Sequence, residues 1–412
     1  MWPEAPVAAG SLADVRSLVL VLAASALAVV LSRFHHRVVL PTVVTEIVLG
    51  ILIGPEVLGW AEVDNYLTFL ANFGLVFLFF FAGLEVVEKR VPRRSVVRGS
   101  IGWAISIAIG LVVGGVLHEA GLEAEGWLIG VALSTTALGT LVPILSDAGI
   151  LRTRLGAAVL GTGVAGEFWP IVVISVFLTG VYGALAEVLL LIAFGALVFG
   201  AALVALRARP PRLLGILRDT LHTTGQAAVR LSVLLLAALV LLAHDVGFDF
   251  VLGAFAAGLV VGLALNSPSG EPVRIRLEGI GFGLMIPIYF VVTGMNFDID
   301  SLLSPTGLAL AALFLGLLVV VRGTSAVLWR RELAPRETLG LVLFGATGLP
   351  LIVAIVGIGT DRGAISTDVG ASLVGAGMIS VLVLPFLATA IVGRQAATRP
   401  VETLEPETAT EY

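Results

Sequence analysis

Long runs of apolar residues alternate with short polar segments along almost the whole chain. About 13 of these runs are long enough to be candidates for crossing a lipid bilayer. Backbone polar groups inside a bilayer must be satisfied within the segment itself, so each run predicts a helix. The runs occupy approximately residues 17–32, 39–54, 67–84, 99–117, 127–146, 155–180, 184–206, 230–244, 248–265, 279–297, 302–322, 338–358 and 366–393. The pattern predicts an all-α polytopic membrane protein with about 13 transmembrane helices.

The loops between the runs alternate in charge. Most of the 24 Lys and Arg residues fall in every second loop, whereas the intervening loops are acidic and contain only Arg16 and Arg362. Because basic loops stay in the cytoplasm, the alternation predicts an N-terminus outside the cell and a cytoplasmic C-terminus. The predicted location is the cell (inner or plasma) membrane, where the basic loops are expected to contact membrane lipid.

The composition narrows the function classes. Hydrophobic residues make up 58% of the 412 residues, charged residues make up 13%, and the mean hydropathy is +1.07. The net charge of −5 gives no reason to expect a nucleic-acid partner, and the absence of cysteine excludes disulfides and thiolate metal sites. No phosphate-binding glycine loop or nucleophilic triad is present. We therefore expect neither enzymatic activity nor a cofactor.

Two charged residues lie inside apolar runs. Glu167 lies near the middle of the run at 155–180, where a carboxylate costs roughly 2.5–3.5 kcal/mol. Arg322 ends the apolar run Leu308–Val321, before the expected membrane boundary at Arg330. Buried charges need partners, so we expect Arg322 to be the counter-charge of Glu167. The plainer alternatives are a glutamate neutralised by hydrogen bonding and an arginine that snorkels to the interface.

The chain also contains an internal repeat. Phe79–Glu85 resembles Phe290–Asn296 at an offset of 211 residues. The offset spans an odd number of runs and so predicts two halves of inverted topology. The same offset pairs Ser134–Gly139 with Gly345–Pro350. Small hydroxyl residues, glycine and proline interrupt both runs, which frees backbone groups to line a cavity. We expect two crossing broken helices there, with Ser134, Gly139, Thr347, Gly348 and Pro350 at the crossover.

A buried carboxylate can bind either a proton or a cation. Competition between the two ions at Glu167 is enough for exchange if the site opens alternately to the two sides of the membrane. Neutral oxygens, which suit Na⁺ or K⁺, are expected from Thr135, Thr136 and Thr162. Pro170 cannot donate to the carbonyl of Gly166, so that oxygen is expected to coordinate a cation or to mark a kink. We therefore expect the transported species to be a monovalent cation, Na⁺ or K⁺, and a proton.

Four segments resemble the conserved blocks of the monovalent cation:proton antiporters, in particular the branch that contains the Kef-type potassium/proton and sodium/proton exchangers. These segments are Leu40–Pro55, Phe81–Glu85, Ser134–Ala137 and Leu252–Leu259. The resemblance extends over about residues 17–393. It implies that Glu167 is the ion-binding acid, that Arg322 is the basic residue of the family's eleventh span, and that the protein is a homodimer.

The resemblance also implies a division of the transmembrane domain, residues 1–393, into two parts. A scaffold or dimerisation part would use spans at about 17–84 and 230–297, and a mobile core would use spans at about 99–180 and 302–393. The span at about 184–206 would link the two parts. Residues 394–412 would form a short acidic cytoplasmic tail.

Two residues depart from the family pattern. The ion-binding position usually carries Asp and here carries Glu167, and the preceding position often carries Asn, Asp or Gln and here carries Gly166. The carboxylate pair of the electrogenic exchangers is therefore missing. A single carboxylate predicts electroneutral exchange. Two other classes stay open, namely a sodium-coupled symporter of an organic anion and an ion channel.

Overall fold

A computed structural model describes residues 12–34, 41–88, 91–177, 226–265 and 270–393, with a few isolated positions between 193 and 200. All regular secondary structure in these ranges is helical. The elements are α1 (Leu12–Phe34), α2 (Thr42–Ile53), α3 (Asn65–Glu88), α4 (Arg93–Glu119), α5 (Gly126–Leu133), α6 (Leu138–Asp147), α7 (Arg154–Phe177), α10 (Ala227–Val246), α11 (Phe250–Leu265), α12 (Glu271–Ile280), η2 (Gly281–Met285), α13 (Ile286–Met295), α14 (Ile299–Leu303), α15 (Pro305–Gly323), η3 (Thr324–Trp329), α16 (Pro335–Gly345), α17 (Pro350–Asp361) and α18 (Thr367–Val392).

The described helices are long and apolar enough for a membrane protein. In these ranges, nine helices can cross a bilayer by length and composition, and three further apolar helices are shorter. Every predicted run except one coincides with one or more of these helices. The exception is the run at 184–206, which lies outside the described residues apart from isolated positions. Apolar side chains such as Val112, Leu234 and Val320 are exposed, as expected for helices that face lipid.

The offset of 211 residues relates whole helices as well as short motifs. In the repeat α2 corresponds to α11, α3 to α12–α13, and α4 to α15–η3. Likewise α5 corresponds to α16 and α6 to α17. Equivalent glycines make equivalent contacts: a Cβ atom at Gly83 would collide with the carbonyl oxygen of Phe255, and one at Gly294 with that of Ile47. These close approaches pack α3 on α11 and α13 on α2.

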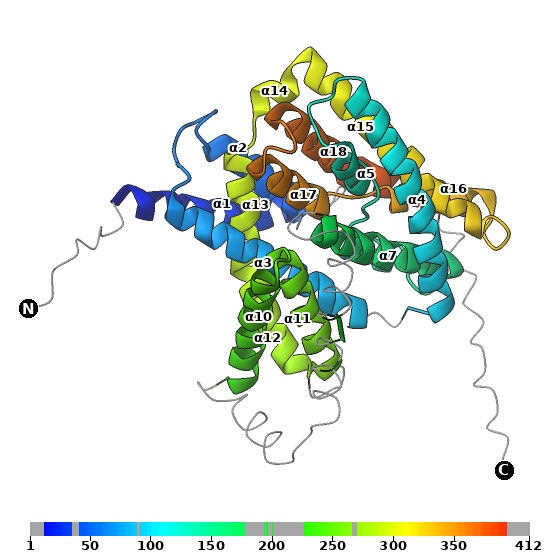
Figure 1. Cartoon of the computed structure of the whole chain (residues 1–412), viewed down its shortest axis with the longest axis horizontal. Coiled ribbons are helices and arrows are strands. Elements are labelled where there is room, and N and C mark those ends of the chain that lie inside the picture. Colours follow the sequence, from blue (N-terminus) through cyan, green and yellow to red (C-terminus); the bar gives the residue numbers. More distant parts are fainter. Residues whose placement is uncertain are drawn as a thin grey trace, which may run out of the picture.

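The helices pack in two groups (Figure 1). In one group α2, α3, α11 and α13 pack together and α10 packs on α11. In the other group α4 packs on α5 and α7, and α18 packs on α15, α16 and α17. The first group corresponds to the expected scaffold and the second to the expected core. The division into a fixed part and a moving part stays a prediction.

Two predicted spans are interrupted in the middle. Residues 134–137 separate α5 from α6, and residues 346–349 separate α16 from α17. The interruptions contact each other, because the amide of Ala137 donates a hydrogen bond of 2.7 Å to the carbonyl of Thr347. The crossing of two broken helices, predicted from their small and hydroxyl-bearing residues, is therefore present. Four helix ends meet at this point inside the bundle.

Candidate functional site at the helix crossing

Glu167 lies on α7 beside the crossing and is 8% exposed. Its Oε1 atom accepts a hydrogen bond of 2.7 Å from the amide of Leu138 and a longer one of 3.4 Å from the amide of Gly139. These amides begin α6 and have no partner within that helix. The helix dipole adds a partial positive charge at the same end. The break between α5 and α6 thus supplies polar donors to a carboxylate held away from water.

Arg322 lies at the end of α15 and is completely buried. Its Nε atom donates to the hydroxyl of Thr136 at 2.9 Å and to the carbonyl of Gly345 at 3.3 Å, and its Nη2 atom donates to the carbonyl of Thr162 at 3.1 Å. Arg322 therefore joins both broken helices to α7. In this conformation none of the ion pairs among the described residues connects Arg322 with Glu167. The direct pairing expected from the sequence stays a prediction.

Gly166 makes room for this arrangement. A Cβ atom there would lie 2.8 Å from Cβ and Oγ1 of Thr136 and 2.9 Å from Nη2 of Arg322. The carbonyl that Pro170 leaves without an intrahelical partner accepts a hydrogen bond of 3.1 Å from the amide of Thr136. The Gly166 carbonyl thus fastens the interrupted segment to α7. Its two expected roles, cation ligand or kink marker, stay predictions.

The hydroxyls of Ser134, expected at the crossover, and of Thr135, Thr136 and Thr162, expected as ligands, differ in their hydrogen bonds. Ser134 and Thr135 donate to carbonyls of α5 at 2.8 Å each, and Thr136 donates to the carbonyl of Gly345 at 2.6 Å. Thr162 presents a fully buried hydroxyl oxygen that has no hydrogen-bond partner. All four residues lie around the crossing, but Thr136 and Thr162 hold Arg322 through their side-chain and backbone oxygens respectively.

The second interruption depends on a residue that the sequence did not single out. Ser380 of α18 accepts a hydrogen bond of 3.1 Å from the amide of Gly348 and donates to the carbonyls of Gly348 and Gly377. Thr347 donates to the carbonyl of Leu343 at 3.1 Å. The only signal in the sequence for Ser380 is a hydroxyl residue inside an apolar run, and many such serines donate a hydrogen bond only to a carbonyl of their own helix. Its contact with Gly348 could not be inferred without the fold.

A cavity of about 80 Å³ lies beside Glu167. Its wall combines α3, η2 and the starts of α6 and α17. The lining includes Phe79, Glu85, Gly139, Thr140, Phe282 and Pro350. Gly139 and Pro350, both expected at the crossover, thus face the cavity that reaches the buried acid. Glu85 brings a second carboxylate to it, which the sequence indicated only as part of a family block.

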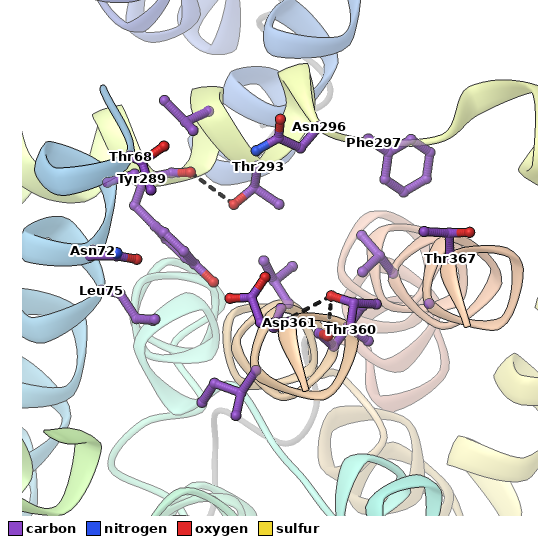
Figure 2. Close-up of a pocket in the computed structure, with 18 of the residues that line it drawn as sticks. Thr68, Asn72, Leu75, Tyr289, Thr293, Asn296, Phe297, Thr360, Asp361 and Thr367 are labelled. Atoms are coloured by element: carbon purple, nitrogen blue, oxygen red, sulfur yellow. Dashed lines mark hydrogen bonds between the residues drawn. The ribbon is translucent and has the colours of Figure 1, made fainter. Parts of the chain in front are cut away.

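A larger cavity of about 340 Å³ lies between α3 and α13 on one side and α17 and α18 on the other. Figure 2 shows polar side chains from all four of these helices or the loops beside them around it. The two cavities approach each other closely. Leu75 and Val353 line the larger one, while Leu78 and Leu351 line the smaller one. About one helical turn of α3 and less than one turn of α17 therefore separate them.

The described ranges contain no group of three or more His, Cys, Asp or Glu side chains that could hold a metal ion. The crossing offers a different donor set, with the carboxylate of Glu167 beside hydroxyl and carbonyl oxygens. Hard oxygen donors with a single negative charge suit a monovalent cation better than a transition metal.

Comparison with known proteins agrees with this geometry. The profile of the family described as "Sodium/hydrogen exchanger, transmembrane" matches residues 21–393. The chain belongs to this family. The predictions of an all-helical transporter fold and of a protein that is not an enzyme are therefore confirmed. The match extends over both groups of helices and over both interrupted spans.

Three individual relatives are less than 30% identical to this chain. The putative Na⁺/H⁺ antiporter YjbQ of Bacillus subtilis is 28% identical over 393 residues, which cover 90% of this chain and 62% of YjbQ. This chain therefore spans less than two thirds of that relative. The Na⁺/H⁺-K⁺ antiporter GerN of Bacillus cereus is 26% identical, with 84% of this chain and 88% of GerN covered. The solved structure of the sodium proton antiporter MjNhaP1 of Methanocaldococcus jannaschii at pH 8 has a TM-score of 0.61 at 19% identity, covering 93% of this chain and 99% of that one. This last likeness shows the fold.

Proposed function

We propose that the chain exchanges a monovalent cation for a proton across the cell membrane, with Glu167 binding the two ions alternately. The observation that carries the proposal is the position of this carboxylate. It is buried at the crossing of two broken helices, accepts hydrogen bonds from the start of α6, and borders a cavity. A structural glutamate needs neither the cavity nor the broken helices.

The chemistry at Glu167 follows from its surroundings. The amides of Leu138 and Gly139 stabilise the ionised carboxylate without supplying a full positive charge. A proton or a small cation is then required to neutralise the buried charge before the site can move through the membrane. Since one carboxylate accepts one of the two ions at a time, binding of the cation releases the proton. Na⁺ is the first candidate because several relatives are named Na⁺/H⁺ antiporters, and the name of GerN adds K⁺.

The two cavities support alternating access. Glu167 lines the smaller cavity, the larger cavity lies further along α17, and about one helical turn around Leu75, Leu78 and Leu351 separates the two. A small sliding of the core group against the scaffold group would open one cavity to Glu167 and close the other. The small residues and the hydrogen bonds at the crossing keep Glu167, Arg322 and Thr136 together during such a movement.

The proposed orientation follows the charge of the loops, with the C-terminus in the cytoplasm. In that orientation the cavity beside Glu167 opens towards the cytoplasm and the larger cavity opens towards the outside. The scaffold group also offers the surface for a homodimer, because α1 and α10 expose apolar side chains such as Val19 and Leu234. The same surface faces lipid in a monomer.

The small cavity beside Glu167 disfavours an organic anion bound at this carboxylate, while the larger cavity of about 340 Å³ falls within the size range of organic-ligand pockets. Pockets for organic ligands measure about 300–1,000 Å³, whereas the cavity beside Glu167 measures about 80 Å³. An ion channel is distinguished by its transport behaviour, since a channel conducts the cation without moving protons.

The proposal is tested in proteoliposomes that contain a pH-sensitive dye and receive Na⁺, K⁺ or Li⁺ in separate experiments. We expect at least one cation gradient to move protons in the opposite direction, and Glu167→Gln to abolish this movement in a protein that is still folded. Cation uptake without proton movement would indicate a channel. A requirement for an organic anion would indicate a symporter, and either result would overturn the proposal.

A further inference from the structure

The larger cavity contains a set of oxygen atoms that the exchange mechanism at Glu167 does not use. Asp361, at the end of α17, contributes a carboxylate, and Asn72 of α3 contributes an amide. Figure 2 shows the side chains of Tyr289 and Asp361 pointing towards each other across the cavity. Asp298 also lines the cavity, with a carboxylate that accepts hydrogen bonds from the amide and the hydroxyl of Ser301. This arrangement brings the carboxylate of Asp361 and several neutral oxygens from facing groups of helices into the same space.

The threonine hydroxyls of this cavity are oriented as acceptors. Thr68 and Thr293 each donate a hydrogen bond of 2.8 Å to a carbonyl four residues earlier, and Thr360 donates one of 2.9 Å to the carbonyl of Val356. A hydroxyl carries one hydrogen and two lone pairs, so these three oxygens have only lone pairs left to offer. Lone pairs on neutral oxygens are what a Na⁺ or K⁺ ion requires.

The charge of Asp361 is available to such an ion. Its neighbour Arg362 directs Nη2 to the carboxylate of Asp249, at 3.0 Å. Asp361 takes part in none of the ion pairs found among the described residues. The nearest arginine in sequence is thus engaged with another acid.

The cavity is separate from the exchange site. Asp361 ends α17, whereas Pro350, which begins α17, lines the cavity of Glu167. With a rise of 1.5 Å per residue, the two ends of this helix lie roughly 16 Å apart. The volume of about 340 Å³ is large enough for a cation together with part of its hydration shell, since a water molecule occupies about 30 Å³ in the liquid.

We propose that this cavity is an outer loading site for the transported cation, in which Asp361 and the neutral oxygens of Asn72, Thr68, Thr293 and Thr360 hold a partly hydrated monovalent cation. The inference rests on the proposed exchange function and on the orientation of the protein. The cation is concentrated at the outer opening and loses the remainder of its water only when the core moves and Glu167 becomes accessible. Asp361 binds and positions the cation.

The test compares cation dependence on the two sides of the membrane. Proton flux is measured in right-side-out and inverted vesicles as a function of Na⁺ on the accessible side. For Asp361→Asn we expect the apparent cation KM on the outer side to rise about fivefold to tenfold, with the maximum rate within about twofold of the wild type and the inner KM unchanged. Such a change is the signature of a lost binding contact that is not used in the rate-limiting step. Thr360→Val should raise the outer KM by a smaller factor, because it removes one neutral oxygen and no charge.

The matched control is Asp245→Asn. Asp245 is exposed near the end of α10 and lies outside both cavities. Its removal changes the net charge by the same amount and should leave both KM values unchanged. Repeating the assay in added choline chloride separates a local binding site from general surface charge, because salt screens surface charge over about 10 Å at 0.1 M.

Three results would overturn the inference. They are an unchanged outer KM in Asp361→Asn, an equal rise in Asp245→Asn, or an equal rise of KM on both sides. None of these results affects the exchange function, which wild-type vesicles test in the same experiment. Absence of cation-driven proton flux in the wild type would instead contradict the proposed function itself.

Discussion

Gly166 provides a sharp test of the structure around Glu167. In Gly166→Ala the new methyl group would lie 2.8–2.9 Å from atoms of Thr136 and Arg322. Overpacking of this kind costs about 1–3 kcal/mol. Relief of the clash would displace the Arg322 guanidinium from Thr136, and a hydrogen bond to a charged group contributes about 1.5–3 kcal/mol. We therefore expect a loss of about 1–3 kcal/mol in stability and a decrease in exchange rate of tenfold or more.

The matched control is Gly316→Ala, because Gly316 lies on α15, the helix that carries Arg322, and a Cβ atom there meets nothing within 4 Å. Thermal unfolding in detergent and proton flux in proteoliposomes are measured for both variants. Gly316→Ala should unfold and transport like the wild type. If Gly166→Ala does so as well, the close packing of Arg322 and Thr136 on Gly166 is refuted.

Three further predictions concern the cation, the outer loop and the stoichiometry. If the Thr135 oxygen is a neutral ligand of the cation, Thr135→Val should raise the apparent cation KM more than it changes the maximum rate. An unchanged cation KM in flux assays would exclude that role. Burial raises the pKa of Asp249, while the Val251 amide, Arg362 and His244 oppose the shift. Arg362→Gln should therefore raise the pKa of Asp249 further and lower the unfolding temperature at the higher pH values at which Asp249 is ionised. The deficit should disappear as the pH falls and Asp249 is protonated in both proteins; a deficit independent of pH would contradict this coupling. Exchange should be electroneutral because Gly166 leaves Glu167 as the sole carboxylate of that pair; a current on a solid-supported membrane would show that a second acid carries a proton.

The sequence predicted the helices well because lipid imposes a simple rule on each of them. A long apolar run must be helical, so run after run coincides with a described helix. The interruptions were also predictable, because glycine and hydroxyl residues at 134–139 and 345–350 repeat at the same offset. The exact residue at which a helix begins depends on local side-chain hydrogen bonds. Ser304, for example, caps α15 by accepting a hydrogen bond of 2.9 Å from the amide of Gly307.

The partners within the site were much harder to predict. Glu167 and Arg322 stood out because a charge in an apolar run is rare. The bonds of Arg322 to Thr136, Gly345 and Thr162 depend on how three distant segments meet, and no local pattern encodes that meeting. The expectation that the two charges would pair directly came from electrostatics alone. In this conformation neutral oxygens accept hydrogen bonds from Nε and Nη2 of the arginine, whose Nη1 atom is buried without a partner. Gly166 leaves open the space that this arrangement needs.

The role of Glu167 as a shared binding site for cation and proton is tested most directly by calorimetry of Na⁺ binding to the detergent-solubilised protein. The titration is carried out in two buffers of different ionisation enthalpy, which reveals the number of protons released. We predict about one proton released for each cation bound, with both binding and release lost in Glu167→Gln and retained at weaker affinity in Glu167→Asp. Proton release that persists in a folded Glu167→Gln variant, or Na⁺ binding to the wild type without proton release, would contradict the mechanism.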